Sequence, residues 1–81
     1  MTVYHVTTLN KLKKYLATGR ITAPVRAWEN IEQAERFSKQ TSRRIILRLN
    51  FPDNADKLEG HYQQARVLFG DYKFTQDHLS L

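Results

Sequence analysis

Within the first sixteen residues, the spacing of apolar side chains changes abruptly from the alternation of a strand to the period of a helix. β-Formers fill residues 3–7, where alternation across the pleat places Val3, His5 and Thr7 on one face. Apolar side chains then recur at helical spacing, and Thr8 between the two patterns is a typical N-cap. The segment therefore predicts a strand that leads directly into a helix and carries one histidine.

Two amphipathic segments predict helices. The apolar face of the first consists of Leu9, Leu12, Tyr15 and Leu16, and Gly19 supplies the expected stop. Asn30 is a candidate N-cap for a second helix over residues 31–39, whose apolar face consists of Ile31, Ala34 and Phe37. The two patterns indicate one helix on each side of residues 20–29.

The remaining apolar runs predict strands. Residues 43–51 alternate most regularly, with Ile45, Leu47, Leu49 and Phe51 facing inward. A weaker run at 21–25 contains Pro24, which belongs at an edge or a bend, and resumes through 26–28. Runs at 63–69 and 72–75 flank Gly70-Asp71, which is typical of a hairpin. We therefore expect a single domain over residues 1–81, an α+β fold with a small mixed β-sheet and two helices in the order β-α-β-α-β-β(-β).

Composition narrows the class of protein. The 81 residues are 41% hydrophobic, enough for one packed core. There is no cysteine, which excludes disulfides and thiolate metal sites and makes a cytoplasmic location the default expectation. The longest aliphatic run, residues 45–47, is far shorter than a membrane-spanning helix, so we expect no membrane association.

Positive charge is concentrated in the amino-terminal part of the chain. The formal net charge is +5, but residues 1–50 carry ten Lys or Arg against three Glu, a charge of +7. This asymmetry favours an anionic partner such as RNA, DNA or a nucleotide, because bound phosphates release counterions. An ordinary solvated face is an equally weighted alternative. The candidate nucleic-acid-binding residues are Lys11, Lys13, Lys14, Arg43, Arg44 and Arg48.

Several chemical motifs are absent from the sequence. The histidines at positions 5, 61 and 78 lack the short spacing of metal ligands, so no metal site is expected. The three glycines are too dispersed for a phosphate-binding loop, and no serine lies in a glycine-flanked elbow. Hydrolases and nucleoside triphosphatases are therefore disfavoured.

The segment Tyr4-His5-Val6-Thr7, followed by a helix that ends at Gly19, resembles the aromatic-His-x-Thr start of the ADP-ribosyltransferase fold. Ala34-x-x-Phe37 and the strand Ile45-Ile46-Leu47 are similar to later family elements, so the resemblance covers about the first fifty residues. It suggests a reduced form of that fold with NAD as the ligand. The resemblance implies that His5 binds the nicotinamide-side ribose, with Thr7 beside it. It also requires a late catalytic carboxylate, for which Glu59 is the candidate.

Three functional hypotheses remain open from the sequence. The first is an ADP-ribosyltransferase-like domain that binds NAD or a nucleic-acid phosphate, with or without transfer. The second is a non-enzymatic module that binds RNA or DNA through its basic residues. The third is a small protein-interaction or inhibitor domain whose exposed sheet edge accepts a partner strand. For His5, a structural role in a buried hydrogen bond competes with a role in ligand binding.

Overall fold

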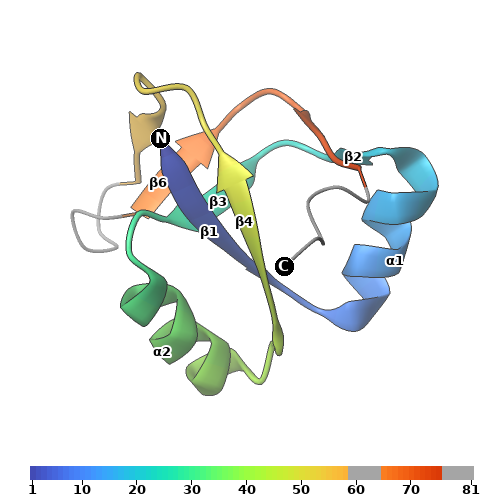
Figure 1. The fold of residues 1–81 in the computed structure, drawn as a ribbon, viewed down its shortest axis with the longest axis horizontal. Helices are drawn as coiled ribbons and strands as arrows, with labels where there is room; N and C mark the ends of the chain where they lie inside the picture. Colours follow the sequence, from blue (N-terminus) through green and yellow to red (C-terminus); the bar gives the residue numbers. More distant parts are fainter. Residues whose placement is uncertain (59–64, 76–81) are drawn as a thin grey trace.

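The computed structural model describes residues 1–58 and 65–75 of the chain (Figure 1). Within these residues it contains two helices, α1 (Leu9–Thr18) and α2 (Ile31–Thr41). The strands in chain order are β1 (Thr2–Thr7), β2 (Arg20–Ile21), β3 (Val25–Trp28), β4 (Ile45–Asn50), β5 (Asp56–Lys57), β6 (Ala65–Leu68) and β7 (Tyr72–Lys73). The predicted α+β class with two helices is confirmed.

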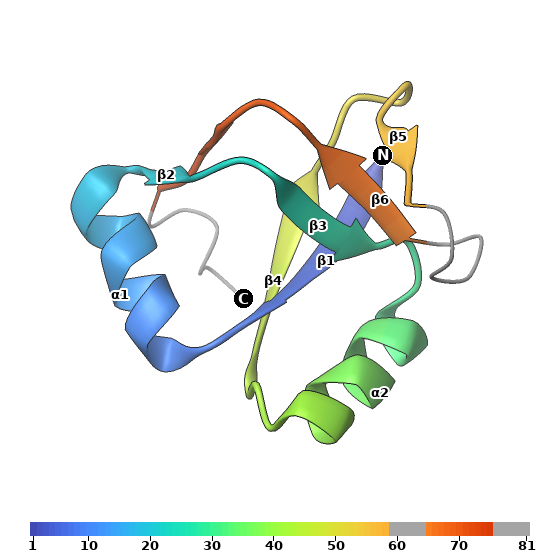
Figure 2. The same cartoon turned by 180° about the vertical axis from the view of Figure 1, so that it is seen from behind.

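Five strands form one sheet in the order β4-β1-β3-β6-β5, while β2 and β7 form a separate two-stranded sheet. Helix α2 packs against β1, β3 and β4, and α1 lies next to β2 at the other end of the molecule (Figures 1 and 2). All five described strand pairings are antiparallel, so the expectation of a mixed sheet is wrong. Strand direction depends on how each connection crosses the sheet, which the order of elements alone does not reveal.

The predicted hairpin around Gly70-Asp71 is also wrong. Strand β6 pairs with β3 and β5, whereas β7 pairs with β2. The Asp71 carboxylate accepts a 2.8 Å hydrogen bond from the Ala23 amide and lies 3.9 Å from the Arg20 guanidinium. These contacts hold the turn against the segment between β2 and β3, so tertiary contacts override the local turn signal. Residues 63 and 64 of the predicted run lie outside the described residues.

The caps expected at the helix ends are present. Thr8 Oγ1 accepts from the Lys11 amide at 3.2 Å, and Asn30 Oδ1 accepts from the Glu32 amide at 2.7 Å. Gly19 adopts a left-handed conformation with φ of 76° as the C-cap of α1. These local interactions define where α1 begins and ends, and thereby which of its side chains face β1.

The main core lies on the sheet face that carries Val3, where the β1–β4 register places His5 opposite Leu47. Its buried members are Val3, Ile21, Val25, Ala27, Leu47, Leu49, Phe51, Ala55 and Phe74. The predicted inward face of residues 45–51 is therefore confirmed. Leu9 and Ile31, however, are 55% and 39% exposed, although both belong to predicted apolar faces. Each is the first residue of its helix.

Replacing Leu47 by alanine should lower the free energy of unfolding by about 2–5 kcal/mol, from lost transfer energy and the cavity left behind. Leu47 is 3% exposed within the core. Leu9→Ala is the matched control, because that side chain is largely exposed, and it should change stability by less than about 0.5 kcal/mol. Urea denaturation measures both variants. Similar losses in the two would show that Leu47 does not face the core.

Candidate functional site

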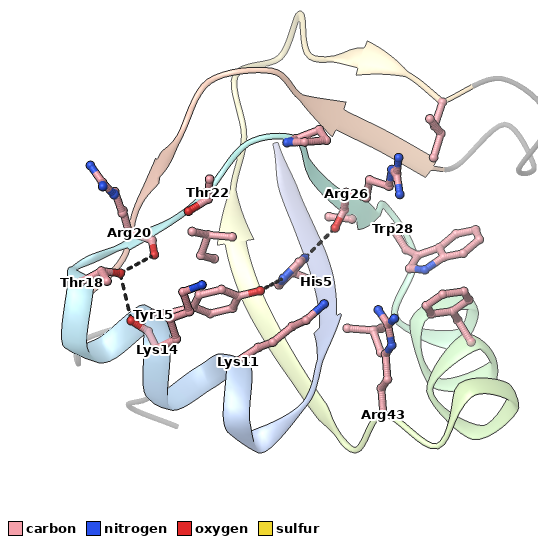
Figure 3. A pocket seen from close by; sticks show the side chains of 16 residues that line it. His5, Lys11, Lys14, Tyr15, Thr18, Arg20, Thr22, Arg26, Trp28 and Arg43 are labelled. Atoms are coloured by element: carbon pink, nitrogen blue, oxygen red, sulfur yellow. Dashed lines mark hydrogen bonds between the residues drawn. The ribbon is translucent and has the colours of Figure 1, made fainter.

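The site begins where β1 and β3 separate. The two strands pair at one register position, Tyr4 opposite Trp28, while β1 and β4 pair over the whole length of β1. Continuing the β1–β3 register would place Arg26 opposite Val6, but no pairing occurs there. The imidazole of His5 lies in the opening instead, with Nδ1 2.7 Å from the Arg26 carbonyl oxygen (Figure 3). A carbonyl oxygen only accepts hydrogen bonds, so Nδ1 carries the proton.

Helix α1 contributes the second partner of His5. The Tyr15 hydroxyl lies 3.1 Å from His5 Nε2 and 3.3 Å from Thr7 Oγ1. In the neutral imidazole Nε2 is an acceptor, so Tyr15 donates to His5 and accepts from Thr7. This network links β3, β1 and α1 through side chains. It gives both ring nitrogens of His5 a partner.

The surroundings of His5 favour its neutral form. Burial lowers the pKa of His5 below its ordinary value of 6.5, since the imidazolium would lose hydration. The hydrogen bond to the Arg26 carbonyl acts in the opposite direction, and the positive charges of Lys11 and Arg43 lower the pKa further. The structural role predicted as an alternative for His5 therefore fits the geometry. The same residue also faces a cavity.

A cavity of about 540 Å³ opens beside His5 and Tyr15, a volume within the range of small-molecule sites. Its walls come from β1, α1, β2 and the segment after it, β3, α2 and the chain that follows α2 (Figure 3). Five of the lining residues are cationic: Lys11, Lys14, Arg20, Arg26 and Arg43. Among the described residues that line it there is no aspartate or glutamate. The cavity is therefore suited to an anion.

Local structure explains how these cations reach the cavity. Lys11 and Lys14 are three residues apart on α1 and so lie on the same side of the helix. Arg43 follows Ser42, which caps α2 in a left-handed conformation with φ of 59°, and the Ser38 hydroxyl donates to the Arg43 carbonyl. This contact ties the backbone of Arg43 to the end of α2. The cations thus come from separate elements that converge on one opening.

Aromatic rings form part of the wall. Trp28 is half-buried at the end of β3, and Phe37 of α2 packs against it with ring centroids 5.7 Å apart and planes inclined by 51°. Both rings line the cavity. Figure 3 shows Trp28 and Arg43 on one side of His5, with Lys14, Thr18 and Arg20 on the other. The cavity therefore has an aromatic end and an end formed by α1 and β2.

Only some of the site residues predicted from the sequence line the cavity. His5, Lys11, Lys14 and Arg43 line the cavity. Thr7 is 1% exposed and lies beneath the Tyr15 hydroxyl, away from the lining. The other three members of the predicted basic set, Lys13, Arg44 and Arg48, are exposed and lie outside the lining. Glu59 lies outside the described residues. The predicted basic set is thus partly a cavity lining and partly ordinary surface.

The lining residues that sequence reasoning did not name as candidates include Tyr15, Arg20, Arg26 and Trp28. Tyr15 was assigned to the apolar face of α1, where its ring does pack, but its hydroxyl was not considered. Arg26 and Trp28 are two residues apart in a short strand. Because side chains alternate across a strand, the sequence could have shown that the two share a face. Arg20 had no sequence signal, since its place depends on β2 lying next to α1.

No protein-family model, curated protein or solved structure matches the chain. Across residues 1–58 and 65–75, no cluster of three or more metal-ligating side chains occurs. In the same part of the chain, neither helix is long and apolar enough to cross a membrane. The functional argument therefore depends on the cavity itself.

His5 should make stability depend on pH. Between its lowered folded pKa and its unfolded pKa near 6.5, the unfolded chain binds a proton that the folded chain does not. The free energy of unfolding therefore rises with pH through this window and loses its dependence on His5 above it. On acidification from about pH 7.5 to about pH 5, the wild type should lose more stability than His5→Gln.

Urea denaturation of both proteins at each pH measures this difference. His61 and His78 are identical in the two proteins, so their titration cancels in the comparison. Parallel pH profiles would show that the folded state does not disfavour the charged form of His5.

Proposed function

We propose that this protein binds a phosphate-bearing nucleotide in the cavity beside His5. The observation that carries the proposal is the convergence of five cationic side chains, without a lining carboxylate among the described residues, on one concave site of about 540 Å³. Concave sites with one sign of charge concentrate ligands of the opposite sign. Arginine and lysine side chains are the usual partners of phosphate oxygens.

The resemblance to the ADP-ribosyltransferase fold makes NAD the first ligand to test. It implies a ribose contact for His5, and the position of His5 in the cavity wall is compatible with that role. Aromatic rings such as Trp28 offer a stacking surface for a nucleotide base. Thr7 is buried behind Tyr15, so we propose that it orients the tyrosine hydroxyl instead of touching the ligand.

The proposed function is the binding of a nucleotide and does not include transfer of an ADP-ribosyl group. Stabilising a ribosyl cation needs a carboxylate near the reacting carbon. None of the described lining residues carries one. Glu59, the predicted carboxylate, lies outside the described residues, so the proposal is restricted to the binding of a nucleotide, with NAD as the first ligand to test.

An NMR titration of the amide resonances with NAD, ADP-ribose and a short RNA tests the proposal. We expect shifts around His5, Lys11 and Arg26 at millimolar ligand or below. Shifts with RNA alone would remove NAD as the ligand while keeping the nucleotide site. If none of the three perturbs the cavity residues, the proposed function is wrong.

Paired charge variants locate the site. Lys14→Gln removes a lining cation and should weaken binding about ten-fold, because a charged hydrogen bond to phosphate is lost. Lys13→Gln is the matched control on the same helix, since Lys13 is exposed and outside the lining. Glutamine is nearly as good a helix former as lysine, so both variants should fold normally. Equal effects of the two variants would indicate a general charge effect instead of a site.

A further inference from the structure

The distribution of charge along the cavity narrows the class of nucleotide ligand. Lys14 and Arg20 lie on one side of His5 and Arg43 on the other, while Lys11 lies over the middle (Figure 3). The two phosphates of a dinucleotide cofactor are adjacent, whereas the cations lie on both sides of His5. A ligand with phosphates spaced along its length is therefore better matched to this distribution of charge.

Each end of the cavity has further features that suit a strand. At the α1 end, the Thr18 hydroxyl lies 2.9 Å and 3.1 Å from the carbonyl oxygens of Lys14 and Arg20, which fixes the turn between α1 and β2. Arg20 also lies 3.9 Å from Asp71, but both side chains are well exposed, so that ion pair is weak and leaves Arg20 able to contact an anion. At the other end, Phe37 supports the Trp28 ring beside Arg43.

A positively charged groove combined with an aromatic surface is the common design of sites for single-stranded nucleic acid. Bases of a single strand are free to stack on a ring, whereas those of a duplex are paired and stacked already. We propose that the cavity binds a single strand of RNA or DNA, with phosphates at its two ends and one unpaired base on Trp28. This inference rests on the proposed nucleotide site and specifies its substrate class.

Trp28 provides the readout, because it is the one tryptophan in the 81-residue sequence. Its fluorescence would be titrated with a short single-stranded RNA, the equivalent DNA, the same sequence as a duplex, and NAD. Stacking of a base should quench the emission with either single strand and not with the duplex. We expect the single strands to bind at least about ten-fold more tightly than NAD, since more cations find a phosphate. The RNA and DNA arms show whether the 2′-hydroxyl contributes.

Variants at the two ends test whether one strand spans the cavity. Arg20→Gln and Arg43→Gln should each weaken binding of the single strands about ten-fold, and the matched control Arg44→Gln, outside the lining, should change it less than about two-fold. Thermal unfolding of each variant confirms that it is folded. Contact with about three phosphates predicts a log–log salt slope near −2 for the wild type.

The outcomes separate this inference from the proposed function. NAD binding that is tighter than strand binding and indifferent to Arg20→Gln would overturn the single-strand proposal and leave the nucleotide site standing. Equal quenching by duplex and single strand would overturn the stacking of an unpaired base on Trp28. If neither NAD nor any oligonucleotide binds, both proposals fail together.

Discussion

The hydrogen bond between His5 Nδ1 and the Arg26 carbonyl oxygen joins β1 to β3 beyond the one position at which their backbones pair. A carbonyl at that position of an antiparallel pair would normally accept from an amide of the neighbouring strand. Here an imidazole takes the place of the amide, so a side chain is interposed between β1 and β3. The two strands pair only at Tyr4–Trp28, and the cavity with its cationic lining lies beside the position that His5 bridges.

The same interaction explains why one histidine serves both the fold and the candidate site. Its Nδ1 proton satisfies the Arg26 carbonyl, and its Nε2 atom accepts from Tyr15, so both nitrogens are engaged within the protein. Removing the ring would take the imidazole donor away from the Arg26 carbonyl, while the Tyr15 hydroxyl would keep Thr7 as a partner. A ligand beside His5 therefore meets the imidazole in a fixed orientation and in its neutral form. The structural and binding interpretations of His5 do not exclude each other.

How much of the fold and of the candidate site could be predicted from the sequence depends on how far apart in the chain the interacting residues lie. Thr8, Gly19 and Asn30 act on amides or turns within a few residues, and all three marked helix ends correctly. Gly70-Asp71 also carries a strong local signal, but Asp71 bonds to Ala23, which is distant in the chain, and the hairpin does not form. The opening between β1 and β3 depends on a backbone carbonyl, which no residue type identifies. The cavity could therefore not be predicted from the sequence, although several of the cations that line it were predicted as binding residues.

The positions of the acidic side chains also bear on the charge of the cavity. All three glutamates of residues 1–50 lie outside the cavity: Glu29 pairs with Arg66 at 3.2 Å, and Glu32 and Glu35 are exposed on α2. An ordinary solvated surface intersperses the two signs, because neighbouring like charges repel. Five of the ten amino-terminal cations instead line one concavity, and none of its described lining residues is an aspartate or glutamate, although Asp71 lies 3.9 Å from Arg20. An anion bound among these cations would reduce their mutual repulsion. The proposed binding site would account for the charge asymmetry of the sequence.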